Sequence, residues 1–176
     1  QQIAETAPEG RKPVIVVFDL RNSLLGVVPA ADRYVYNAAQ VEEAVQFVQG
    51  LLADRNTDEV LSQEQLLARR KDGVTFEGPE IFVVIDDYSD FMAGYSDPFD
   101  VWERAAARGG QVGFHLIISR VADQQAYAAQ RGVIAALRNS NSPVLFMSAD
   151  PTLINVVGGI RVSEPAGDLA EGAEFE

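Results

Sequence analysis

Short apolar runs alternate along the chain with longer stretches of helical spacing. The runs are rich in β-branched residues and bounded by Pro, Gly or polar residues, and they are expected as strands over Val14–Phe18, Ile81–Ile85, Gly113–Ile118 and Pro143–Met147. Runs this apolar are typical of strands buried on both faces, as in parallel sheets covered by helices. The pattern therefore predicts an α/β fold with a mainly parallel sheet between helices.

Helical segments are expected between these strands. Asn37 and Gln40 have the spacing of a capping box in front of an apolar stripe in Val41–Leu52. A second helix is expected from residue 97 to 109, with Pro at its first helical position and Gly after its last one. A third helix is expected over Gly132–Arg138.

The composition excludes several classes of function. The 176 residues contain no cysteine and one histidine, which excludes thiolate chemistry and multi-histidine metal sites. The net charge of −12 opposes binding to nucleic acid. No apolar run approaches the roughly 18 residues of a membrane span, so no direct membrane contact is expected. Residues 1–165 are expected to form one domain, followed by an acidic tail over 166–176.

Polar side chains follow the expected strands at their carboxyl ends. Asp19 ends the first strand, Asp86 and Asp87 end the second, Ser119 and Arg120 end the third, and Ser148 follows the fourth. Because the carboxyl ends of parallel strands share one edge, these side chains are expected to gather where open α/β sheets bind ligands. The alternative is that the two adjacent Asp residues only cap a turn or the following helix.

The order of these segments resembles the second half of an FtsK/SpoIIIE-type motor ATPase. The matching stretches are 14–21, 82–87, 106–120 and 134–146, and the apolar run into two acids at 82–87 resembles a Walker B strand. Shorter motifs are similar to the last ATPase module of EccC, the motor of the type VII (ESX) secretion system; they lie at 24–29, 85–88, 147–150 and 158–160. The resemblance covers about residues 13–165.

The resemblance implies a RecA-like P-loop NTPase fold. The first strand and the phosphate loop of that fold are absent from this chain, since no G-x-x-x-x-G-K-[ST] motif occurs in it. ATP and Mg²⁺ are the implied cofactors, in the intact module only. The implied partners are the C-terminal signal helix of secreted helical-hairpin substrates, the other ATPase modules of the motor, and further copies in a homo-oligomer. The expected location is cytoplasmic, within a membrane-anchored secretion complex.

The resemblance also assigns roles at the expected sheet edge. Asp86 would hold Mg²⁺ and Asp87 would be the catalytic base. Ser119 would sense the γ-phosphate region, and Arg120 would contact phosphate or a neighbouring subunit. The alternatives are a strand-terminating turn for Ser119 and a surface ion pair for Arg120. His115, which falls within the matching stretch, is expected to be a buried, hydrogen-bonded structural residue.

Besides the missing phosphate loop, the base position departs from the family pattern. Active family modules often carry Glu where this chain has Asp87. The shorter side chain predicts slow hydrolysis, because a misplacement of about 1 Å costs on the order of a hundredfold in rate.

Three functional hypotheses remain open. The first is a degenerate or regulatory ATPase module that contributes to recognising the substrate signal and couples it to protein export. The second is a catalytically competent P-loop ATPase module whose phosphate loop lies outside this chain. The third is a receiver-like α/β binding domain, since receivers cluster acids such as Asp19, Asp86 and Asp87 around Mg²⁺; a long helical insertion after the first strand fits this hypothesis poorly.

Overall fold

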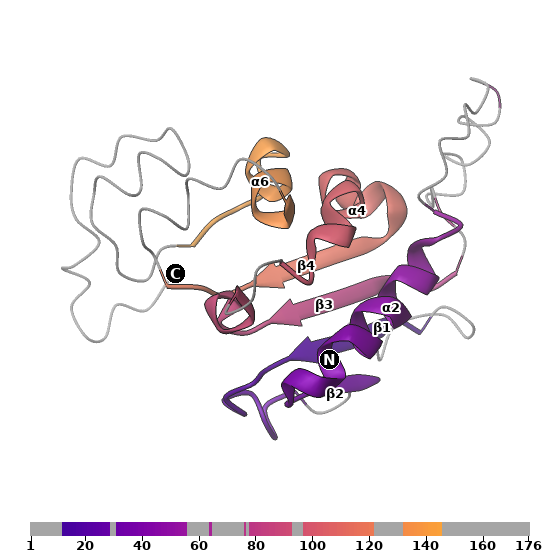
Figure 1. The fold of residues 1–176 in the computed structure, drawn as a ribbon. Coiled ribbons are helices and arrows are strands. Elements are labelled where there is room, and N and C mark those ends of the chain that lie inside the picture. Colours follow the sequence, from indigo (N-terminus) through magenta and orange to yellow (C-terminus); the bar gives the residue numbers. More distant parts are fainter. Residues whose placement is uncertain are drawn as a thin grey trace, which may run out of the picture.

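The computed structural model describes residues 12–28, 31–55, 64, 76, 78–92, 97–121 and 132–145. Within these ranges a single sheet contains the strands β1 (Val14–Phe18), β2 (Arg33–Val35), β3 (Ile81–Ile85) and β4 (Phe114–Ile118). All neighbouring strands are parallel, and their order across the sheet is β2-β1-β3-β4 (Figure 1). The predicted parallel α/β sheet is therefore confirmed.

The helices of the described ranges are α2 (Val41–Leu52), α4 (Glu103–Arg108) and α6 (Gly132–Asn139). Short 3₁₀ helices span Ala38–Gln40, Tyr88–Met92, Asp100–Trp102 and Gly109–Val112. The three expected helical segments are thus present. The third begins at the expected residue, Gly132, and the starts of the other two differ from expectation.

The start of α2 differs in detail from a capping box. Asn37 Oδ1 accepts a hydrogen bond from the Ala39 N–H at 3.0 Å and so caps the 3₁₀ turn in front of the helix. Gln40 Oε1 accepts a hydrogen bond from the Tyr36 N–H at 3.3 Å, one residue before the N–H that a capping box would use. The α-helix therefore follows a capped 3₁₀ turn.

The second expected helix is divided. Asp97 Oδ1 accepts a hydrogen bond from the Phe99 N–H at 2.9 Å and stabilises a turn, and the α-helix begins only at Glu103. The irregular start brings Phe99 and Trp102 into the core, where both are fully buried. The helix ends as predicted before Gly109, whose φ of +45° is one that glycine adopts readily.

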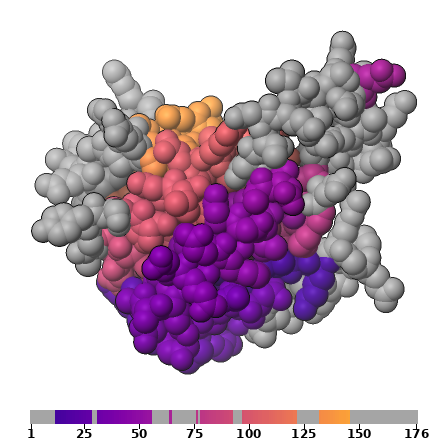
Figure 2. All heavy atoms as spheres, turned by 45° about the vertical axis from the view of Figure 1, so that its right-hand side comes forward, coloured from indigo at the N-terminus to yellow at the C-terminus, as the bar shows by residue number. Residues whose placement is uncertain are grey.

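The core lies between one face of the sheet and the helices. Its buried residues come from alternate strand positions and from all three α-helices; they include Val16, Phe18, Ile81, Val83, Ile85, Ala44, Val48, Leu52, Ala105 and Val133. Aromatic rings fill its centre, since the ring centroid of Phe99 lies 5.2 Å from that of Phe18 and 5.3 Å from that of Trp102. Figure 2 shows the α2 and α4 segments side by side on the surface, and Arg108 donates a hydrogen bond to the Arg55 carbonyl at 3.1 Å.

The other face of the sheet carries the intervening strand residues. Ile117 is 57% exposed there, and the His115 ring stacks on Phe82 with 4.5 Å between centroids. The His115 side chain is partly exposed, and its Nε2 lies 3.7 Å from Glu80 Oε1 with no hydrogen-bond partner within the described residues. The expectation of a buried, hydrogen-bonded histidine is wrong, because strand alternation places this residue on the face away from the core.

Two strand assignments differ from expectation. The strand β2, which pairs with β1, was not predicted because it has three residues and one of them is Arg33. The described part of the expected strand Pro143–Met147 forms no strand, and Leu145 in it is 87% exposed. Asn141 turns the chain after α6 with a φ of +55°, so this apolar run does not continue into the described sheet.

Other sequence features fall outside the described residues. These are the acidic tail over 166–176 and the motifs at 147–150 and 158–160. Among the described helices, none has both the length and the hydropathy needed to cross a membrane.

Candidate functional site

The carboxyl ends of three strands bring the expected polar residues together. In the parallel register Phe18 pairs with Ile85, and Ile85 pairs with Ile118. The next residues along each strand, Asp19, Asp86 and Ser119, therefore stand side by side at one edge of the sheet. The predicted gathering of strand-end side chains is confirmed for these three residues, and Ser148 lies outside the described residues.

Asp86, at the end of β3, links the chain segments that follow β1 and β4, the strands on either side of β3. Its Oδ1 accepts a hydrogen bond from Ser119 Oγ at 2.7 Å, and its Oδ2 accepts one from Ser23 Oγ. Its backbone N–H donates to the Phe18 carbonyl at 2.9 Å, which extends the sheet pairing by one residue. The carboxylate is partly exposed and is held between two hydroxyl groups that can rotate.

Asp19 has a different environment. It is fully buried, and its carboxylate accepts hydrogen bonds from the Leu24 N–H at 2.7 Å, the Ser23 N–H at 3.1 Å and the Tyr34 hydroxyl. Burial alone would raise the pKa of Asp19, but the hydrogen bonds from Tyr34, Leu24 and Ser23 together hold that pKa below its usual value. Burial, together with the Asp19 carboxylate, raises the pKa of Tyr34 to about 12.

These contacts make Asp19 the residue that folds the loop after β1 back onto the sheet edge. A receiver-like domain needs accessible acids at this edge. A fully buried carboxylate that is already saturated with donors offers no such group, so the receiver-like hypothesis has no support at Asp19.

The two carboxylate oxygens of Asp87 lie in different environments, one in an ion pair and one buried. Its Oδ2 lies 2.8 Å from Arg21 Nη1 in an ion pair, while its Oδ1 is buried and has no hydrogen-bond partner within the described residues. Its backbone has a φ of +47°, which Asp tolerates better than most residues, and its N–H donates to Ser119 Oγ at 2.8 Å. The carboxylates of the two adjacent aspartates therefore contact different partners, Ser23 and Ser119 for Asp86 and Arg21 for Asp87.

Arg21 is a residue of this site that sequence reasoning did not single out. Besides Asp87, it holds Asp90 through two bonds, Nε to Oδ2 at 2.7 Å and Nη2 to Oδ1 at 2.8 Å. The hydrogen bond to Asp90, together with the charges of Asp87 and Asp90, raises the pKa of Arg21. The signal in the sequence was an arginine two residues beyond a strand-end acid, but its partners depend on the 3₁₀ turn Tyr88–Met92, which only the structure reveals.

Ser119 and Arg120 end β4 in the expected place. The Ser119 hydroxyl donates to Asp86 and accepts from the Asp87 N–H, so one side chain connects both acids. The Ser119 carbonyl accepts from the Tyr88 N–H at 2.9 Å. The Arg120 guanidinium lies 5.6 Å from the centre of the Tyr88 ring, in a cation–π contact.

The oxygen donors at this edge fit Mg²⁺ in kind. Mg²⁺ is usually held by one or two carboxylates, with water and substrate phosphates completing the shell. Asp86, with the hydroxyls of Ser23 and Ser119 beside it, provides such a carboxylate. No group of three or more His, Cys, Asp or Glu residues in the described part of the chain is arranged to hold a metal, so phosphate and water would have to supply the remaining ligands.

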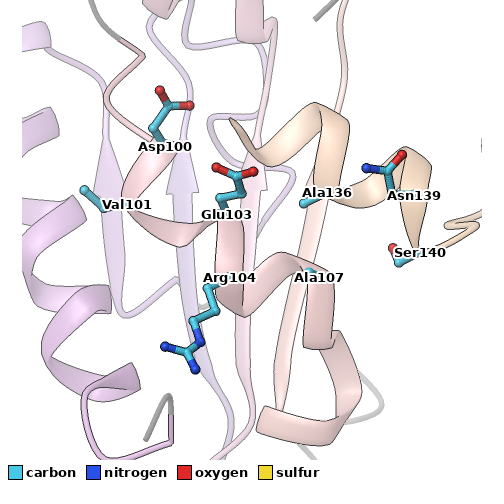
Figure 3. Close-up of a pocket in the computed structure, with 8 residues that line it drawn as sticks. All are labelled: Asp100, Val101, Glu103, Arg104, Ala107, Ala136, Asn139 and Ser140. Atoms are coloured by element: carbon cyan, nitrogen blue, oxygen red, sulfur yellow. The ribbon is translucent and has the colours of Figure 1, made fainter. Parts of the chain in front are cut away.

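A separate groove lies on the helical side of the molecule, between α4 and α6. It has a volume of about 590 Å³ and is lined by Asp100, Val101, Glu103, Arg104, Ala107, Ala136, Asn139 and Ser140 (Figure 3). Burial, the charge of Asp97 and that of Glu103 raise the pKa of Asp100. None of the strand-end residues lines this groove.

Curated proteins similar to this chain are components of ESX secretion systems. The chain is 31% identical over 170 residues to the ESX-5 secretion system protein EccC5 of Mycobacterium marinum. It is 29% identical over 153 residues to the ESX-4 secretion system protein EccC4 of Mycobacterium tuberculosis. These alignments cover 94% and 86% of this chain, and the chain spans 12% of the length of each relative. No protein-family model matches the chain.

Solved structures with the same fold include two from Thermomonospora curvata. The cytoplasmic domain of its type VII secretion ATPase EccC has a TM-score of 0.70 and 25% identity, over 91% of this chain and 18% of that chain. A chain described as an ATPase has a TM-score of 0.65 and 30% identity, over 83% of this chain and 53% of that chain. The structure of T. curvata EccC ATPases 2 and 3 with a signal sequence peptide has a TM-score of 0.72, over 88% of this chain and 27% of that chain; its 24% identity supports the fold alone.

The parallel α/β fold and the similarity over 94% of the chain agree. This chain is homologous to the ATPase domains of the EccC proteins of ESX (type VII) secretion systems.

Proposed function

We propose that this chain is part of a regulatory ATPase module, the last one, of an EccC-type secretion motor. The observation that carries the proposal is the sheet edge at which Asp86 lies between two serine hydroxyls while its neighbour Asp87 is ion-paired to Arg21. At this edge the Asp86 carboxylate can bind a nucleotide-bound metal ion, whereas Asp87, the residue in the position of the base, is held in an ion pair with Arg21. The cytoplasmic location is inferred from the T. curvata relative, which is described as a cytoplasmic domain.

In this proposal Asp86 holds the Mg²⁺ of a bound nucleotide. When bound, Mg²⁺ neutralises charge on the phosphates. Ser119 senses the γ-phosphate region through the hydroxyl that now contacts Asp86. Arg120, whose guanidinium lies over the Tyr88 ring, contacts phosphate or a neighbouring subunit of a homo-oligomer. Binding of ATP and Mg²⁺ requires the phosphate loop of the intact module.

Asp87 is proposed to be a weak or vestigial base. It is one methylene shorter than Glu, and a general base must reach the water whose proton it accepts. Its Oδ2 is already engaged by Arg21 at 2.8 Å. Both features favour slow hydrolysis, and slow hydrolysis suits a module that regulates the motor better than one that drives it.

The proposed partners are the C-terminal signal helix of secreted helical-hairpin proteins and the other ATPase modules of the motor. The support is the T. curvata structure, in which EccC ATPases 2 and 3 are bound to a signal sequence peptide. Signal recognition by this chain is inferred from that relative, and no docking residue is assigned to it.

The test is nucleotide binding and hydrolysis by the full-length protein and its variants. We expect Asp86→Asn to weaken binding of Mg²⁺–ATP by about tenfold or more, because the metal loses its carboxylate. Asp87→Asn should leave the slow turnover nearly unchanged. The matched control is Asp54→Asn, an exposed aspartate just beyond α2.

Two outcomes would contradict parts of this proposal. Fast turnover that Asp87→Asn lowers by a factor of about a hundred or more would favour the catalytically competent module instead. Equal nucleotide affinity in Asp86→Asn and the wild type would show that Asp86 does not hold the Mg²⁺ of the nucleotide.

A further inference from the structure

We propose that Arg21 is a positioning residue that keeps Asp87 unreactive. This inference rests on the proposed function, in which Asp87 occupies the position of the base. It concerns a different residue and adds a cause for slow hydrolysis that the short side chain alone does not supply.

The guanidinium of Arg21 is fixed by three contacts. Two of them form a bidentate pair with Asp90, at 2.7 and 2.8 Å, and the third reaches Asp87 Oδ2 at 2.8 Å. Bidentate arginine–carboxylate pairs are the most strongly oriented of protein ion pairs. Asp90 thus orients the Arg21 guanidinium toward Asp87.

In this arrangement one oxygen of Asp87 is engaged by Arg21 and the other is buried. Oδ2 already accepts from Arg21, and Oδ1 is buried without a hydrogen-bond partner in the described structure. The residue as a whole is 9% exposed. A base must accept a proton from water through one of these oxygens, so Arg21 competes with that water at Oδ2.

The backbone of Asp87 holds the carboxylate in this place. Its left-handed φ of +47° is stabilised by the hydrogen bond from its N–H to Ser119 Oγ. Arg21, by contrast, has a side chain that is 60% exposed, so substituting it can uncover Asp87 without disturbing the core.

The experiment combines carboxylate labelling with turnover in the full-length protein. Carbodiimide coupling of an amine to exposed carboxylates, read by mass spectrometry, reports the accessibility of Asp87 without nucleotide. We expect Arg21→Gln to raise the labelling rate of Asp87 several-fold. Arg21→Lys keeps the positive charge but cannot contact Asp90 and Asp87 through separate guanidinium nitrogens, so it should give an intermediate rate. The matched control is Arg33→Gln. It removes a surface ion pair in which Arg33 Nη1 lies 2.7 Å from Oε1 of Glu43, a residue of α2.

Turnover distinguishes a positioning role from a structural one. With saturating Mg²⁺–ATP, Arg21→Gln should raise kcat by about tenfold while the KM for ATP stays unchanged, because a base is released and no nucleotide contact is lost. The double variant Arg21→Gln/Asp87→Asn should return to the wild-type rate. Arg33→Gln should not differ from the wild type in either measurement.

The outcomes separate this inference from the proposed function. Unchanged labelling of Asp87 in Arg21→Gln overturns the inference whether or not nucleotide binds. Raised labelling with no gain in kcat in a protein that binds nucleotide also overturns it. A protein that binds no nucleotide in any variant contradicts the proposed function, while raised labelling of Asp87 in that protein still supports the shielding of Asp87 by Arg21.

Discussion

Asp19 and Asp86 occupy equivalent places, each one residue beyond the paired positions Phe18 and Ile85 on neighbouring strands. Asp19 is fully buried and receives two backbone N–H groups and a tyrosine hydroxyl. Asp86 is partly exposed, and its carboxylate receives serine hydroxyls. Backbone donors cannot turn away from a carboxylate, whereas hydroxyl donors can. A strand-end acid is thus structural where backbone amides saturate it, and open to a ligand where only hydroxyls contact it.

The largest expected effect separates these two acids directly. Asp19→Ala should lower the free energy of unfolding by about 3–5 kcal/mol, because it leaves buried backbone and hydroxyl donors unpaired. Asp86→Ala should cost less than about 1 kcal/mol, since its hydroxyl partners can turn to water. Denaturant unfolding of both variants, with the exposed Asp54→Ala as control, measures the difference. Equal losses at the two acids would break the comparison.

A smaller effect is expected from one donor to Asp19. Tyr34→Phe removes the hydroxyl that contacts the Asp19 carboxylate, and should cost about 1–2 kcal/mol, because hydrogen bonds to charged groups exceed neutral ones. Tyr36→Phe is the matched control, since Tyr36 is 54% exposed and should change stability by less than about 0.5 kcal/mol. Thermal melting measures the stability of the two variants, and an equal loss of stability in both would contradict this account.

At the other acid, Ser119→Ala should cost about 1 kcal/mol. The variant removes the donor to Asp86 and the acceptor for the Asp87 N–H in one step. Ser119→Thr keeps the hydroxyl and should recover most of the loss. Ser89→Ala, at an exposed position of the neighbouring turn, is the control, and denaturant midpoints are the measurement.

The smallest effect is a dependence on alkaline pH. The folded state raises the pKa of Tyr34 from 10.0 to about 12, so the stabilisation by its hydroxyl is complete below pH 10 and is lost as the pH rises through 12. The stability difference between the wild type and Tyr34→Phe should therefore shrink over this interval. A difference that stays constant from pH 9 to 12 would show that Tyr34 does not donate to Asp19.

Much of the sheet could be predicted from the sequence, since β1, β3 and β4 are mainly apolar runs whose composition is independent of their neighbours. The edge strand β2 could not, because its three residues become a strand only by pairing with β1. The apolar run at Pro143–Met147 had the right composition, but the turn at Asn141 separates its described part from the sheet.

The candidate site was predictable to a similar extent. Asp86, Asp87 and Ser119 were identified because strand ends share an edge. Ser23 and Arg21 were not, because the loop that carries them is folded back by Asp19, and their partners are 63 to 69 residues away in the chain. Contacts of this kind follow from the packing of loops and leave no local pattern in the sequence.

Ser119 has one hydroxyl proton, and that proton is directed at Asp86. In the proposed function, a phosphate oxygen that accepted this proton would leave Asp86 Oδ1 without its donor, and this is the carboxylate that would hold Mg²⁺. The serine would in this way exchange a proton contact for a metal contact in the same event. Loading of the two ligands at this edge would then be cooperative, with the hydroxyl rotation as the step that joins them.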